Sequence, residues 1–252
     1  MNLTKKIVKQ GLMAVLVFGV LFITFAQFSK KAEASENFGT DMTPTTNENI
    51  FYDEGKEMYF DTREDGYIDE VYEIRDGKVF REVPITEYIE QPEEDRTNEE
   101  IIKQDIKNPL FSARAAAIYS YNETSNEAVR LFGQRASIIQ ENPGPGSDTL
   151  EIGYSASYSH EFTVSVNADI IKVIQAGVSY TYNTTASISS THTMTIEPGY
   201  SGYWRFDPSV RKSMGTLKNL SNNTSQSIRA YYPIKFNNRL DGYLVAVKTP
   251  LK

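Results

Sequence analysis

The sequence offers few side chains for nucleophilic, acid–base or metal chemistry. Cysteine is absent, and histidine occurs only as His160 and His192, which excludes a thiolate nucleophile and leaves little room for imidazole catalysis. The sequence contains neither a Gly-x-Ser-x-Gly motif nor a phosphate-binding glycine loop. We therefore expect a protein that is not an enzyme, with no catalytic residues, no cofactor and no cofactor-binding residues.

The two histidines fall on the apolar side of two alternating segments. If those segments pair about a turn centred near residue 176, His160 and His192 face each other across the ladder. Such a pair could respond to protons or bind a metal weakly. The alternative is that both are half-buried strand residues without a metal.

Residues 61–69 are similar to the first part of a calcium-binding loop. Acidic residues, among them Asp61 and Asp69, stand at positions 1, 5 and 9, with glycine at position 6. However, Arg63 and Tyr72 occupy positions 3 and 12, where oxygen ligands are needed. The segment is either a calcium site or an acidic hairpin turn, and the turn suits these residues better.

The first 34 residues have the pattern of a secretory signal peptide. Lys5, Lys6 and Lys9 precede an apolar run over residues 11–26, and Ala32 and Ala34 form an Ala-x-Ala cleavage site. The run is shorter than the ~20 residues that span a bilayer, which favours cleavage over an uncleaved anchor. We expect a secreted, extracellular protein of a Gram-positive bacterium.

Charge is distributed unevenly after the signal peptide. Residues 35–105 hold 22 acidic and 7 basic side chains, whereas residues 106–252 hold 10 and 14. This asymmetry predicts an acidic N-terminal region, residues 35–110, and a β-rich C-terminal domain, residues 111–252. The acidic region is either a solvated arm or a segment that docks on the basic half until it is removed. The net charge of −7 argues against nucleic acid as a partner.

Short strands and one helix are expected in the acidic region. The sequence favours strands at residues 56–60, 67–74 and 79–83, with a hairpin turn at Asp76 and Gly77. Residues 97–100 form a capping box, which predicts a short helix near residues 98–107. Further strands are expected at residues 200–206, 227–236 and 243–248.

Two long alternating segments define the fold class. Residues 154–168 and 178–196 place apolar residues at most even positions and serine, threonine or other polar residues at odd positions. This period of two predicts strands with one buried and one wet face. We expect a mainly β fold, an elongated antiparallel sheet or sandwich with two long Ser/Thr-rich strands. The intervening segment, residues 169–177, is either a helical turn or an apolar crossover.

This Ser/Thr-rich alternation, followed by Pro198 and Gly199, resembles the long strands of aerolysin-type β-pore-forming toxins, including proteins like epsilon-toxin and mosquitocidal toxin. The resemblance covers residues 150–206 and is compositional. It implies that residues 169–177 correspond to the insertion loop of that family, and that Ile170, Ile171, Val173 and Ile174 contact lipid.

The resemblance implies a membrane-active pore former with a target membrane or cell-surface receptor as partner and with a homo-oligomer as the active form. The alternative is a non-catalytic secreted β module that binds a partner or a cell surface. The sequence carries no clear receptor-binding module, so the target is left open.

Overall fold

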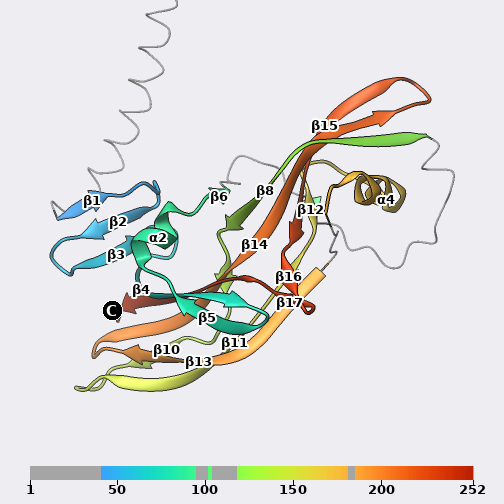
Figure 1. Ribbon diagram of the computed structural model, residues 1–252. Coiled ribbons are helices and arrows are strands. Elements are labelled where there is room, and N and C mark those ends of the chain that lie inside the picture. The colour runs from blue at the N-terminus through green and yellow to red at the C-terminus, as the bar shows by residue number, and fades with distance from the viewer. Residues whose placement is uncertain (1–40, 95–101, 104–117, 181–184, 252) are drawn as a thin grey trace, which may run out of the picture. The chain divides into compact units, whose positions relative to one another are not determined.

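The computed structural model describes residues 41–94, 102–103, 118–180 and 185–251 (Figure 1). Strands predominate and the described helices are short, which confirms the expected mainly β fold. The chain divides into two compact units, one ending at Thr62 and the other beginning at Arg63. The second unit therefore includes part of the acidic region together with the C-terminal strands.

The first unit is a meander of three short antiparallel strands. β1 (Met42–Pro44) pairs with β2 (Ile50–Asp53), and β2 pairs with β3 (Met58–Asp61). Asp53 stabilises the turn after β2, because its carboxylate accepts the backbone N–H groups of Gly55 and Lys56 at 3.0 and 3.1 Å.

The second unit is organised around β14 (Tyr200–Asn219), a strand of 20 residues. The first part of β14 pairs with β18 (Gly242–Pro250) on one edge and with β9 (Gln134–Arg135) and β10 (Gln140–Asn142) on the other. Its second part lies between β8 (Tyr119–Leu131) and β15 (Thr224–Pro233).

The large sheet continues beyond β18. β4 (Gly66–Arg75) pairs with β18, and β5 (Lys78–Glu82) pairs with β4. Asp76 and Gly77 connect β4 and β5 with φ angles of 50° and 68°, which confirms the expected hairpin turn. β6 (Glu93–Glu94) runs parallel to β8.

A smaller sheet packs against this one and contains the two Ser/Thr-rich strands. β11 (Asp148–Ser159) and β13 (Thr185–Ile196) form a continuous antiparallel ladder, followed by β17 (Arg239–Leu240) and β16 (Lys235–Phe236). Most even-numbered residues of β11 and β13 are buried, and they join Trp204, Phe206 and Leu244 in one apolar cluster. The predicted alternation of buried and exposed faces is therefore confirmed.

Both Ser/Thr-rich strands are shorter than expected. Each is 12 residues long. After Ser159 the chain leaves β13, and β12 (Glu161–Phe162) pairs instead with β15 and β7 (Ile102–Lys103). At the other strand, residues 178–180 form a bend, and residues 181–184 lie outside the described part.

The described helices are α2 (Ile85–Glu90) and α4 (Ala168–Gly177). The helix expected near residues 98–107 is wrong for Ile102 and Lys103, which form β7 because they pair with β12; the rest of that span lies outside the described residues. In the described ranges, we find no helix with the length and apolar character needed to cross a membrane.

Acidic residues of the second unit dock on basic residues of its C-terminal strands. Asp69 pairs with Lys248, Glu93 with Arg130, and Glu94 with Lys212, each at 2.7 Å. Of the two alternatives for the acidic region, docking rather than free solvation thus describes these three residues.

Candidate functional site

Helix α4 lies in the segment for which the sequence left a helical turn or a crossover open. Asn167 caps its first turn, because the Asn167 side chain accepts the N–H of Ile170 at 2.9 Å. The helix ends at Gly177, where an added Cβ would lie only 2.8 Å from the carbonyl oxygen of Tyr121. Glycine therefore allows the end of α4 to approach β8 closely.

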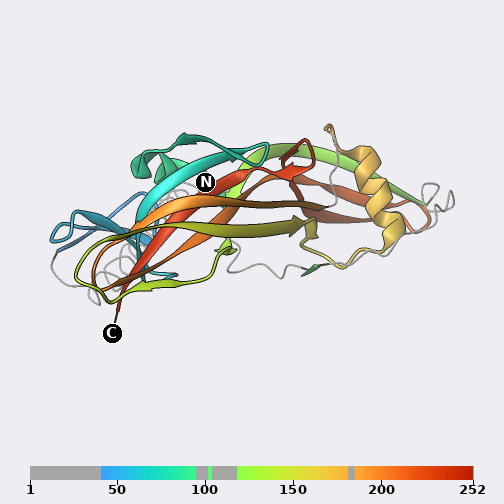
Figure 2. The same cartoon turned by 90° about the horizontal axis from the view of Figure 1, so that it is seen from below.

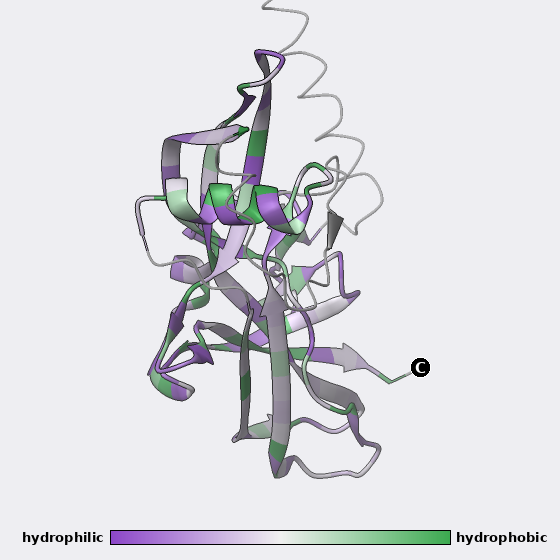
Figure 3. Cartoon of the chain, turned by 90° about the vertical axis from the view of Figure 1, so that its right-hand side faces the viewer, coloured by the Kyte–Doolittle hydropathy of each residue, from purple (hydrophilic) through white to green (hydrophobic). Residues whose placement is uncertain are grey.

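The apolar side of α4 covers the sheet formed by β8, β14 and β15. Figure 2 shows α4 crossing these strands, and Figure 3 shows hydrophobic and hydrophilic residues in alternating bands along the helix. Ile171 and Ile174 are 3% and 0% exposed. They join a cluster with residues of all three strands, namely Tyr121, Leu217, Ile228, Ala230 and Tyr232.

All four residues expected to contact lipid are covered in this structure. Ile171 and Ile174 are buried, while Ile170 and Val173 are partly buried against the same cluster. Phe162 and Val166, which precede α4, are also buried there. The apolar side chains of residues 162–174 in this cluster are thus packed against one face of the sheet.

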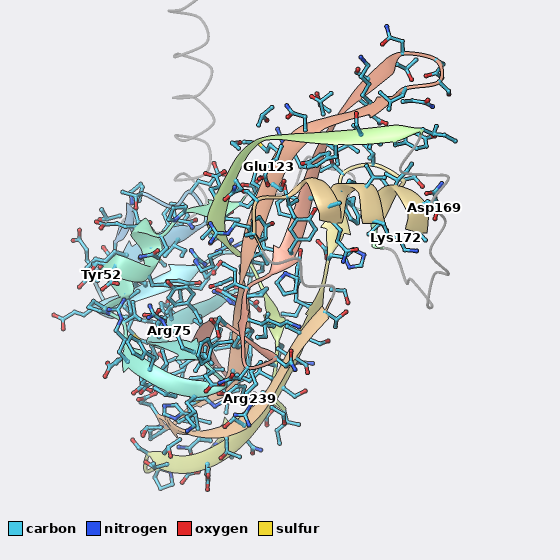
Figure 4. The ribbon with its side chains drawn as sticks, turned by 45° about the vertical axis from the view of Figure 1, so that its right-hand side comes forward. Tyr52, Arg75, Glu123, Asp169, Lys172 and Arg239 are labelled. Carbon is cyan, nitrogen blue, oxygen red and sulfur yellow. The ribbon has the colours of Figure 1, made fainter. Side chains whose placement is uncertain are left out.

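Glu123 of β8 fixes the chain immediately after α4. Its Oε2 accepts hydrogen bonds from the Ser179 N–H at 3.0 Å and from the Ser179 hydroxyl at 2.5 Å, and its Oε1 accepts the Ser213 hydroxyl at 2.6 Å. Asn126 donates to Glu123 Oε2 at 3.2 Å and to Ser179 Oγ at 2.7 Å. We call Glu123, Asn126, Ser179 and Ser213 the latch (Figure 4 labels Glu123, with Asp169 and Lys172 on α4).

A β-bulge helps to orient the latch. Met214 pairs with Ser125 and Gly215 with Glu123, so Thr124 is an extra residue in β8. Bulges bend a strand and redirect its side chains, which suits a carboxylate that must reach a neighbouring segment. Gly215 is required here, because an added Cβ would lie 2.4 Å from the Tyr121 ring.

The hydrogen bonds of the latch favour the ionised carboxylate. Partial burial alone would raise the pKa of Glu123, but the hydrogen bonds from Ser179 and Ser213 outweigh it and hold the pKa below its usual value. Burial raises the pKa of the adjacent Tyr121, so its phenol stays neutral. The latch is therefore strongest where Glu123 carries its charge.

The expected pairing of the two histidines is wrong. The observed register centres on residue 172 rather than 176, so Ile152, not His160, lies opposite His192. His160 follows the end of β11 and packs edge-on against Phe162, with 5.3 Å between ring centroids. The two imidazoles therefore belong to different parts of the core.

His192 belongs to an aromatic group between the two sheets. Its ring centroid lies 4.3 Å from that of Tyr72 and 5.5 Å from that of Trp204. Burial lowers the pKa of His192, and the carboxylate of Glu70 opposes this only in part. His192 is thus held neutral in a packed environment.

The acidic segment that is similar to a calcium-binding loop contains the end of β3 and the start of β4. Asp69 pairs with the ammonium of Lys248 at 2.7 Å, a partner that competes with a cation. Across the part of the chain that the structure describes, no three or more acidic or histidine side chains group in a way that could hold a metal ion. The cleavage residues Ala32 and Ala34 lie outside the described residues.

Sequence reasoning identified α4 as a candidate site but missed the latch. Asn126, Ser179 and Ser213 are ordinary polar residues, and Ser213 lies 90 residues from Glu123 along the chain. A carboxylate on an alternating strand carries no local signal of its distant partners. Only the pairing of β8 with β14 brings them together.

The chain belongs to a family of unknown function (DUF6060), which matches residues 120–251, more than half of the sequence. The matched region begins near the start of β8 and contains the latch, α4 and both Ser/Thr-rich strands. Comparisons with curated proteins and with solved structures gave no match.

Proposed function

We propose that this protein is a secreted, membrane-active protein that permeabilises a target membrane as an oligomer, in the manner of aerolysin-type toxins. The observation that carries the proposal is the arrangement of α4. The apolar helix α4 lies between two alternating segments, and its isoleucines are buried against a sheet. The latch holds the chain directly after the C-terminal end of α4 by hydrogen bonds. The proposal includes export after cleavage at Ala34 by a Gram-positive bacterium.

The sequence around α4 has the period that a membrane β-hairpin needs. Residues 158–168 place Tyr158, Phe162, Val164 and Val166 on one side and polar residues on the other, and residues 178–188 alternate in the same way. A transmembrane strand requires about 9–11 such residues. Residues 169–177 would then form the turn that enters the bilayer first.

Insertion requires this segment to leave its sheet. In the folded protein the apolar residues of the segment are buried rather than exposed to water. Only a closed barrel satisfies every backbone group of inserted strands, so membrane entry and oligomer closure must be coupled. For the chain after α4 to move in this way, the hydrogen bonds of the latch must break.

A disulfide lock tests the proposal directly. Asn126 Nδ2 donates to Ser179 Oγ at 2.7 Å, so these two side chains are in contact, and the natural chain has no cysteine. The variant Asn126→Cys/Ser179→Cys therefore carries the only possible disulfide. We expect the reduced double variant to release dye from phosphatidylcholine/phosphatidylglycerol vesicles and the oxidised form to release none.

Each single-cysteine variant also loses a latch residue but cannot form the intramolecular disulfide, so it serves as the matched control and should release dye equally under both redox conditions. Equal leakage from the locked and unlocked forms would show that α4 does not leave the sheet. No leakage and no SDS-resistant oligomer from the parent, before or after mild proteolysis, would exclude the membrane function itself. Ile171→Asp and Ile174→Asp are poor tests, because a charge at either buried position destabilises the fold as well.

A further inference from the structure

Two arginines with no ion-pair partner line one cleft of the second unit. Arg135 of β9 and Arg239 of β17 are exposed, and neither forms an ion pair with any residue that the structure describes. By contrast, carboxylates lie within 4 Å of five other guanidinium groups, those of Arg63, Arg75, Arg81, Arg130 and Arg205. In a chain with a net charge of −7, two arginines against one carboxylate residue, Glu161, leave the lining of this cleft with a net positive charge, which indicates an anionic ligand.

The cleft has the size and lining of a small-molecule site. Its volume is about 730 Å³, within the range typical of ligand pockets. Serine residues of the two long strands line it in cross-strand pairs, with Ser155 opposite Ser189 and Ser157 opposite Ser187. Figure 4 shows Arg239 beside the Ser/Thr-rich strands.

The remaining polar residues select for more than a negative charge. Asn238 contributes a side-chain amide at the β16–β17 turn, whereas Asn237 Nδ2 donates to Asp76 Oδ2 at 3.1 Å. The buried residue Glu161 also lines the cleft. A bare inorganic anion would leave the Asn238 amide and the serines to water. A ligand that combines an anionic group with several hydroxyl groups matches the whole lining.

The cleft continues into a second hollow. Arg135, Ser155 and Ser189 also line a groove of about 990 Å³, and Gly153, Ile138 and Ile139 are further lining residues of this groove. These isoleucines are 66% and 45% exposed. A ligand longer than one sugar ring can therefore extend from the cleft into this groove. There the two isoleucines can contact the carbon face of a second ring.

We propose that this cleft binds an acidic saccharide, with Arg135 and Arg239 holding its carboxylate and the serine pairs and the Asn238 amide holding its hydroxyl groups. The site lies apart from the latch, and its ligand is the terminal acidic sugar of a glycan. The inference does not depend on membrane permeabilisation, because binding is measured without a bilayer.

Calorimetric titration of the full chain tests this assignment. The probes are glucuronate and N-acetylneuraminate as acidic sugars, glucose as the neutral match, and inorganic phosphate as the bare anion, all at equal ionic strength. We expect at least one acidic sugar to bind, and glucose and phosphate each to bind at least about fivefold more weakly.

Arg135→Gln and Arg239→Gln should each weaken binding of the acidic sugar about fivefold, the effect of one partly exposed charge contact. Ser157→Ala should weaken it less, and Lys218→Gln, which removes an exposed charge near the C-terminal end of β14 and outside the cleft lining, should leave it unchanged. Unchanged emission of Trp204 would confirm that each variant is folded. Equal binding of glucose, equal binding of phosphate, no effect of either arginine variant, or no binding of either acidic sugar would each overturn the proposal.

Discussion

A substitution at Asp207 should lower the stability of the second unit more than substitutions at most of its other positions. It is 0% exposed, and its carboxylate accepts hydrogen bonds from Arg205 Nε and from the Gly133 N–H, both at 2.9 Å, and from the hydroxyl of Tyr88. Burial alone would raise the pKa of Asp207, but Arg205 and Arg130 outweigh burial and keep it below its usual value. The carboxylate is therefore ionised and balances part of the charge of two buried guanidinium groups.

Asp207→Asn preserves the shape of this side chain but removes its charge. Leaving a buried charge without its partner costs about 3–5 kcal/mol. We expect about 3 kcal/mol, the lower end, because Arg130 retains Glu93 at 2.7 Å and Arg205 retains Glu64 at 3.7 Å. This is a large fraction of the 5–15 kcal/mol that stabilises a typical domain.

Urea unfolding followed by Trp204 fluorescence measures the effect. Trp204 is the only tryptophan in the chain and is fully buried beside Arg205. The unfolding midpoint should fall by about 1–2 M with little change in slope. Glu87→Gln, which removes a surface carboxylate paired with Arg81, should leave the midpoint unchanged.

A double variant separates charge from packing. Asp207→Asn/Arg205→Met removes one of the stranded guanidinium groups, so it should recover part of the lost stability. A loss below about 1 kcal/mol in Asp207→Asn, or no recovery in the double variant, would refute the view that charge balance holds this part of the core.

Three further predictions concern the latch, the aromatic group and a tight backbone contact. Because the folded pKa of Glu123 is lowered, its stabilising effect is complete above the ordinary glutamate range and lost as pH falls through the folded value. The protection of α4 against hydrogen exchange, corrected for the intrinsic pH dependence of amide exchange, should therefore fall in acid, and Glu123→Gln should lower it at neutral pH; identical protection in parent and variant would contradict this. Because the folded pKa of His192 is also lowered, stability should decrease as pH falls below about 6.5, and His192→Gln should reduce that decrease in thermal unfolding. Gly133→Ala should destabilise the second unit strongly, since the new Cβ would lie 1.7 Å from the Phe206 carbonyl oxygen; an unchanged melting temperature would show that the backbone relaxes freely.

The sequence determined the local features of this protein. A period of two identified the alternating faces of β11 and β13, because each strand packs one face on the core and leaves the other in water. Asp76 and Gly77 predicted a turn because a tight hairpin needs positive φ at its central residues.

The length of β14 could not be predicted from the sequence in the same way. Pro208 suggests a break, because proline cannot donate a hydrogen bond in a ladder. In the structure Pro208 is the last residue paired with β18, and Ser209 is the first paired with β8. The strand continues through proline because its neighbours change at this point, which is a property of the whole sheet.

Tertiary structure also decided where β11 ends and what α4 covers. The alternating pattern runs past His160, but Glu161 and Phe162 pair with β15, so the strand leaves β13. The isoleucines of residues 169–177 suit either a helix or an extended crossover, and the apolar face of β8, β14 and β15 accommodates the helix. The latch and the arginine-lined cleft likewise unite residues from distant strands. Periodicity and turn chemistry act between near neighbours in the chain, whereas these sites depend on which strands pair, and that choice is made by burial across the whole unit.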